Sequence, residues 1–68
     1  MNLEAMQMSA DLIFADAVQD LAAKTGLPLA EVRKAAICSA AYEALYDFDT
    51  GMWKEGPDAF AELIEPHL

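Results

Sequence analysis

Cysteine and histidine are the residues best suited to nucleophilic or metal chemistry, and this chain holds one of each, Cys38 and His67. A thiol nucleophile needs a neighbouring base or cation that lowers its pKa. A zinc site needs three or more protein ligands. Cys38 lies in an apolar stretch with no histidine near it, which predicts a buried, inert thiol. We therefore predict no catalytic residue, no metal ligand and no cofactor site.

The acidic residues after position 46 match two known motifs in part, and both matches fail. Asp47, Asp49 and Asp58 would fill positions one, three and twelve of a calcium loop. However, Gly51 comes one place early for the sharp turn, and the last ligand of such a loop is a glutamate. The triplet Asp49-Thr50-Gly51 also spells the aspartic-protease motif, which requires a β-rich body that the pattern of this chain does not predict. These residues are typical of an acidic turn.

Composition and charge narrow the function classes further. The chain has 12 acidic and 4 basic residues, a net charge of −8, and 56% apolar residues. The apolar fraction excludes disorder of the whole chain. The negative charge disfavours unaided binding to nucleic acid or an anionic membrane, because both need phosphates to be neutralised by Lys and Arg. The charge suits a basic partner protein, and it equally suits a solvated surface.

The length of 68 residues predicts a single helical domain, 1–68, with a marginal core. Small folds are often stabilised by a disulfide, a metal or a partner subunit. A single cysteine excludes an internal disulfide, so we expect a homo-oligomer (a dimer) or another protein to stabilise the fold. The start of the sequence lacks the basic and apolar pattern of a secretory signal. Together with the unpaired cysteine, this predicts a cytoplasmic protein that does not enter a membrane.

Apolar residues recur every three or four positions, which predicts an all-α bundle of three main helices. The first helix is expected to end at residue 24 and to begin at about residue 9, with Ser9 as a possible N-cap, or at an earlier residue. The second is expected from about 28 to 47, apolar nearly all round and hence buried on all sides. A loop anchored by Met52 and Trp53 follows. The third helix is expected from residue 57 or 58 to Pro66, with a buried stripe that includes Leu63.

Residues 20–35 resemble a helix-turn-helix unit, with Gly26 at the turn and Leu27 among the residues that pack the helix pair. In DNA-binding proteins of this type, the second helix lies in the major groove. Lys24, Arg33 and Lys34 would then contact DNA. The same turn joins helices in many proteins that bind no DNA, and the acidic residues around it oppose phosphate. A helix-turn-helix transcriptional regulator is therefore the alternative interpretation and not the leading one.

A longer resemblance rests on four short patterns: Leu21-Ala22-x-x-Thr25-Gly26-Leu27, Glu31-Val32, Tyr46-Asp47 followed by Thr50, and Asp58-Ala59-Phe60. In these patterns the stretch 12–63 resembles a family of short helical proteins common in anaerobic bacteria, for which no activity is established. Some members lie beside genes that resemble toxins, so the resemblance implies an antitoxin-like or accessory role. This chain departs from the family by lacking a histidine next to Thr50 and by carrying Gly56-Pro57.

The leading hypothesis is a non-enzymatic protein-interaction module, antitoxin-like or regulatory, that binds a partner through apolar anchors with an acidic rim. Tyr46, Asp47, Asp49 and Trp53 are the predicted partner-binding residues, because aromatic residues beside a helix break are frequent interface anchors. An acidic mimic of nucleic acid is a further alternative. Its only indication is a pair of carboxylates, Asp16 and Asp20, one helical turn apart.

Overall fold

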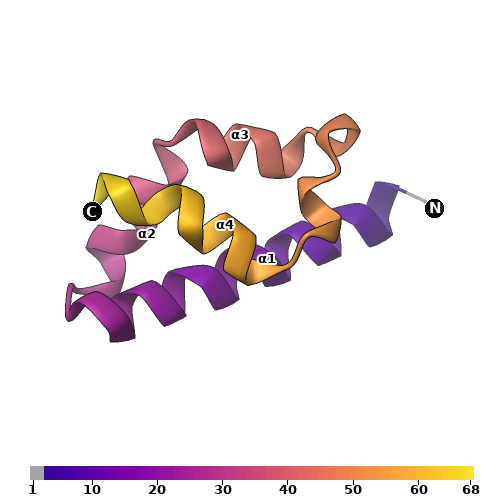
Figure 1. Cartoon of the computed structure of the whole chain (residues 1–68). Helices are drawn as coiled ribbons and strands as arrows, with labels where there is room; N and C mark the ends of the chain where they lie inside the picture. Colours follow the sequence, from indigo (N-terminus) through magenta and orange to yellow (C-terminus); the bar gives the residue numbers. More distant parts are fainter. Residues whose placement is uncertain (1–2) are drawn as a thin grey trace.

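Helix α1 spans Leu3–Thr25 and forms one long side of the molecule, against which the other helices pack (Figure 1). The computed structural model describes residues 3–68, which also form α2 (Leu29–Ile37), α3 (Ala40–Tyr46) and α4 (Pro57–Ile64). Single 3-10 turns lie at Phe48–Thr50 (η1), Met52–Lys54 (η2) and Glu65–His67 (η3). The described residues contain no strand, so the predicted all-α bundle is confirmed.

Helix α1 begins at Leu3, which agrees with the earlier of the two expected starts and not with a start at residue 9. Its buried residues recur every three or four positions, as in any helix with one face on a core: Ala10, Ile13, Ala17, Val18 and Leu21. Ser9 is therefore inside the helix, and its predicted N-cap role is wrong. Its hydroxyl donates instead to the Trp53 carbonyl at 3.0 Å. That partner lies 44 residues away in the chain, so no local pattern could have indicated it.

The predicted helix from 28 to 47 is two helices, α2 and α3, separated at Cys38 and Ser39. Ser39 caps α3: its hydroxyl oxygen accepts the Tyr42 N–H at 3.3 Å, and its O–H donates to the Ala36 carbonyl at 2.6 Å. Serine at an N-cap competes with continued helix by satisfying a free backbone N–H. The continuous apolar pattern concealed this boundary, because apolar residues continue on both sides of it.

Helix α2 is not buried on all sides, as the sequence predicted. Val32 and Ala36 are fully buried, whereas Leu29 and Ile37 are 50% and 45% exposed. Cys38, predicted to be buried, is exposed. A helix of only nine residues that crosses the end of α1 contacts its neighbours along one face, and the opposite face remains in solvent.

The turn between α1 and α2 matches the predicted helix-turn-helix-like pair. Gly26 has a φ of 75°, and its N–H donates to the Ala22 carbonyl at 3.0 Å, which closes α1. This left-handed conformation favours glycine because it has no Cβ. Leu27, expected to pack between the two helices, is instead 39% exposed at the surface of the turn.

The loop and the last helix complete the core, with one departure from the prediction. Trp53 is buried, and α4 begins at Pro57, at the first helical position that suits proline. Phe60 and Ile64 are fully buried against α1 and α3. Leu63 is 46% exposed, so its predicted burial is wrong. The face of α4 turned to the core is centred on Phe60 and Ile64, and Leu63 lies at its edge.

Candidate interaction surface

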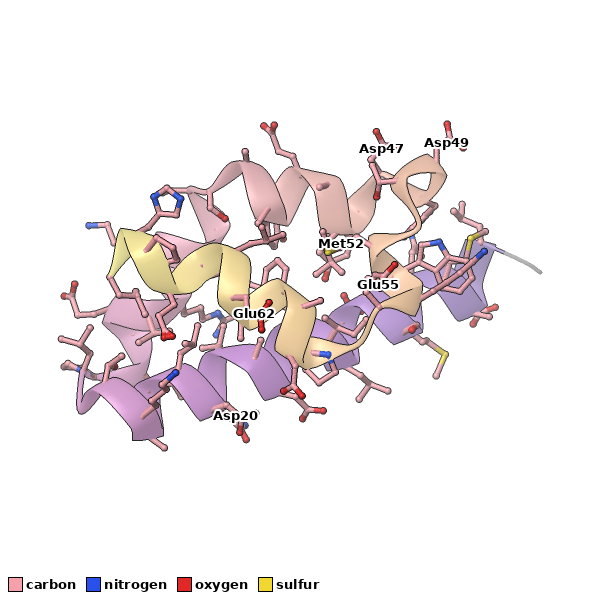
Figure 2. All side chains as sticks on the ribbon, in the orientation of Figure 1. Asp20, Asp47, Asp49, Met52, Glu55 and Glu62 are labelled. Atoms are coloured by element: carbon pink, nitrogen blue, oxygen red, sulfur yellow. The ribbon has the colours of Figure 1, made fainter. Side chains whose placement is uncertain are left out.

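The predicted partner-binding residues lie at the end of α3 and in the loop that follows. Asp47 and Asp49 are exposed and extend away from the bundle (Figure 2). The Asp47 carboxylate accepts the N–H of Asp49 at 3.3 Å. Trp53 is only 8% exposed, and its indole N–H donates to the Phe48 carbonyl at 3.1 Å. The fold therefore uses Trp53 to anchor the loop and does not place it on a common surface with the two aspartates.

Tyr46, the fourth predicted residue, lies on the wall of a groove between α1, α2 and α3. The volume of this groove is about 430 Å³. Its walls combine apolar and aromatic side chains with three charged or polar ones: Asp11, Phe14, Ala15, Val18 and Gln19 of α1, Leu29, Arg33 and Ile37 of α2, and Tyr42 and Tyr46 of α3. We call it the α1–α2–α3 groove. Its shape and lining suit the burial of apolar side chains from another molecule.

A chain of three aromatic rings, one from α1 and two from α3, lines this groove. The ring centroids of Phe14 and Tyr42 are 5.4 Å apart, and those of Tyr42 and Tyr46 are 5.0 Å apart. The Tyr46 hydroxyl donates to the Asp11 carboxylate. Burial raises the pKa of Tyr46 above its ordinary value of 10.0, and the hydrogen bond to Asp11 and its negative charge raise it further. Tyr46 is therefore a neutral, fixed donor at physiological pH.

The exposed side of α2 carries two adjoining rows of side chains, one turn apart within each row: Leu29, Arg33 and Ile37, and beside them Ala30, Lys34 and Cys38. All six are exposed, and together they line a second hollow of about 410 Å³. We call them the α2 ridge. Each row places a cation between two apolar or weakly polar residues. The ridge is continuous with the groove, because Leu29, Arg33 and Ile37 line both.

The three residues predicted to contact DNA in the alternative interpretation do not form one basic patch. The Lys24 ammonium donates to both carboxylate oxygens of Glu65 at 2.9 Å, on the α4 side of α1. This hydrogen bond, reinforced by the charge of Glu65, raises the pKa of Lys24. Arg33 and Lys34 lie on the α2 ridge. Lys24 is thus engaged on one side of α1, while the other two cations lie on another helix.

The sequence pattern does not mark Leu29 and Ile37 as surface residues, and it does not indicate that Phe14 and Tyr46 line the same groove. One signal was available in the first helix. Met8 and Leu12 lie on the opposite side from its buried residues and are 61% and 65% exposed. Apolar residues on two sides of one helix indicate a second contact surface, whereas the repeat of Ile13, Ala17 and Leu21 indicates only the core-facing side.

Other kinds of site receive no support from the described geometry. Within residues 3–68, no group of three or more Cys, His, Asp and Glu side chains is placed to hold a metal ion. None of the helices in this range is long and apolar enough to cross a membrane. Comparisons with protein-family models, curated proteins and solved structures found no match. The groove and ridge are therefore interpreted from their own geometry.

Proposed function

We propose that this protein is a non-enzymatic protein-interaction module whose contact surface consists of the α1–α2–α3 groove and the adjoining α2 ridge. The observation that supports it is the exposure of Leu29 and Ile37 beside the groove. A chain of 68 residues buries only about 60% of the surface that its unfolded form exposes, so it has few large apolar side chains to spare. Exposed apolar side chains that adjoin a groove are typical of an interaction site.

The lining of the groove indicates what kind of segment it receives. Apolar and aromatic walls favour a partner helix that inserts its apolar side chains, as in other helix-in-groove interactions. Arg33 at one wall and the Tyr46–Asp11 pair at another provide polar contacts at the rim. Interfaces of this type combine an apolar centre with a polar edge. The module acts by burying its groove against a partner, without a chemical step.

An antitoxin-like or regulatory role in the cytoplasm is the specific form of this proposal. The family resemblance suggests the role, and the exposed thiol of Cys38 suits a reducing compartment. The net charge of −8 would attract a basic partner from a distance and speed its association. Contact in the groove would then provide the affinity.

The test is a selection of helical peptides from a random library on the immobilised protein, followed by mapping of the bound peptides by NMR chemical shifts. We expect the shifts to concentrate on residues of the groove and the ridge. Ala15→Arg should weaken peptide binding by at least about tenfold, because a long charged side chain then fills the groove mouth. Ala23→Arg is the matched control, since Ala23 is exposed on the same helix but lines none of the hollows described above.

Peptides that map to another surface, or that bind Ala15→Arg as well as the wild type, would contradict the proposal. A parallel titration with duplex DNA at several salt concentrations tests the regulator alternative. Tight DNA binding that falls steeply with salt and disappears in Arg33→Glu would favour that alternative over the module.

A further inference from the structure

We propose that the partner at the α1–α2–α3 groove and the α2 ridge is a second copy of this chain. The α2 ridge of each copy lies against the outer face of α1 of the other. The inference rests on the proposed function, because it names the partner of the same groove and ridge. The outer face of α1 consists of exposed residues on the side away from the core: Met8, Leu12, Ala15, Asp16 and Gln19. Met8 and Leu12 are among the most exposed large apolar side chains of residues 3–68.

The spacing of the two faces is complementary. On the ridge, Arg33 lies one helical turn from Leu29 on one side and from Ile37 on the other. On the outer face of α1, Asp16 lies one turn from Leu12. Four residues of helix advance about 6 Å along the axis on either element. Seating Arg33 on Asp16 therefore brings an apolar ridge residue onto Leu12, whether the two helices run parallel or antiparallel.

The charges are also complementary. Among residues 3–68, Lys24 is engaged by Glu65, whereas Arg33, Lys34 and Asp16 form no ion pair. The whole chain has a net charge of −8, so two copies repel each other in most orientations. Contact between the ridge and the outer face of α1 instead brings Arg33 of one copy, with Lys34 beside it, to the Asp16 carboxylate of the other. Such pairing selects one orientation over the alternatives.

The α2 ridge and the outer face of α1 adjoin on each copy, so a single two-fold axis can form both ridge-to-α1 contacts of the dimer. Ala15 and Gln19 of the outer face line the α1–α2–α3 groove together with Leu29 and Arg33 of the ridge. A two-fold axis through the groove would form the ridge-to-α1 contact twice and close the assembly as a dimer. A stable dimer buries about 800 Å² of each copy, which is less than a fifth of the 4400 Å² that one copy exposes.

Sedimentation equilibrium of the full chain and its charge variants tests this arrangement. We expect the wild type to be a dimer and to dissociate as salt is raised. Arg33→Glu should weaken dimerisation by at least about tenfold, because it places a second negative charge against Asp16 in both contacts. Asp16→Arg should do the same by placing two cations together. An equimolar mixture of the two variants, and the double variant that carries both changes, should dimerise again because every contact that forms is once more between opposite charges.

Two controls separate this effect from net charge. Lys54→Glu changes the net charge by the same amount as Arg33→Glu but lies in η2, outside both faces. Glu62→Arg matches the charge change of Asp16→Arg, and Glu62 is exposed on α4, outside both faces (Figure 2). Both controls should leave the dimer constant within about twofold. Far-ultraviolet circular dichroism checks that each variant is folded.

A wild-type chain that stays monomeric at millimolar concentration would overturn this inference, as would a dimer that is indifferent to Arg33→Glu and Asp16→Arg. A mixture of the two variants that fails to recover would overturn it as well. Selected peptides that still bind the groove of a monomeric chain would leave the proposed function standing while this inference fails. A chain that neither dimerises nor selects groove-binding peptides would contradict both.

Discussion

The two flanks of α1 differ in how completely they are covered. On one flank α4 places Phe60 and Ile64 fully inside the core, and the Lys24–Glu65 ion pair joins the ends of the two elements. On the other flank the short helix α2 buries Val32 and Ala36 but leaves Leu29 and Ile37 half exposed beside a groove. Helix α1 thus has one flank that α4 covers, which we call the closed flank, and one flank beside α2 that is only partly covered.

Because of this difference, the residues that stabilise the fold and the residues available to a partner lie on different flanks of α1. Large side chains that are fully buried contribute most to the free energy of unfolding. Apolar side chains left half exposed contribute less to folding and keep their remaining surface for a partner. We therefore expect substitutions on the α4 flank to change stability and substitutions on the α2 flank to change association.

The sharpest test of this comparison changes the same residue type on both flanks. Ile64→Ala should cost about 2–5 kcal/mol of unfolding free energy, because it leaves a cavity at a fully buried position. Ile37→Ala should cost about 1 kcal/mol or less, because nearly half of that side chain is already in water. Urea unfolding followed by circular dichroism measures both values. Equal losses of unfolding free energy in the two variants would show that the two flanks are equally packed, and would contradict the difference described above.

The second-largest change in unfolding free energy is expected at the boundary between α2 and α3. Ser39→Ala removes the cap on the Tyr42 N–H and should cost about 1 kcal/mol. Ser39→Asp should retain most of the stability, because aspartate is an equally good N-cap. Chemical denaturation of the three proteins measures the differences. If the Ser39→Ala variant were as stable as the wild type, the boundary between α2 and α3 would not depend on this cap.

The third prediction concerns the hydrogen bond between Tyr46 and Asp11, two residues that line the groove. The pKa of Tyr46 is raised in the folded state, so the folded protein holds this proton more tightly than the unfolded chain. Its contribution to stability is complete below about pH 10 and declines as the pH rises further. The ultraviolet absorbance of tyrosinate should show one tyrosine titrating late, and Tyr46→Phe should remove that late step. Tyr42→Phe serves as the control and should leave the late step in place.

The smallest effect is expected at the ion pair on the closed flank. Lys24 is highly exposed, and surface ion pairs contribute little. The pKa of Lys24 is raised by Glu65, so its contribution exists at neutral pH and is lost as the pH rises through that raised value. Lys24→Gln should lower the melting temperature slightly at low salt and have no effect at high salt. A large effect that persists in high salt would show that α4 depends on this pair.

Much of the fold could be predicted from the sequence, because the strongest signals were local. The spacing of Ile13, Ala17 and Leu21 predicts the core face of α1, and Gly26 and Pro57 mark helix boundaries through their own backbone preferences. The anchoring of the loop by Trp53 was also predicted. Each of these properties depends on residues a few positions apart, so neighbouring residue types determine it.

The candidate surface could not be predicted in the same way, because it depends on contacts between distant residues. The sequence alone did not reveal that Ser9 would bond to Trp53, that Tyr46 would bond to Asp11, or that Ile37 would remain half exposed. Burial of an apolar side chain is decided by which neighbours reach it. Periodicity indicates that a helix has an apolar face, and only the tertiary packing decides whether that face is covered by this chain or left for a partner.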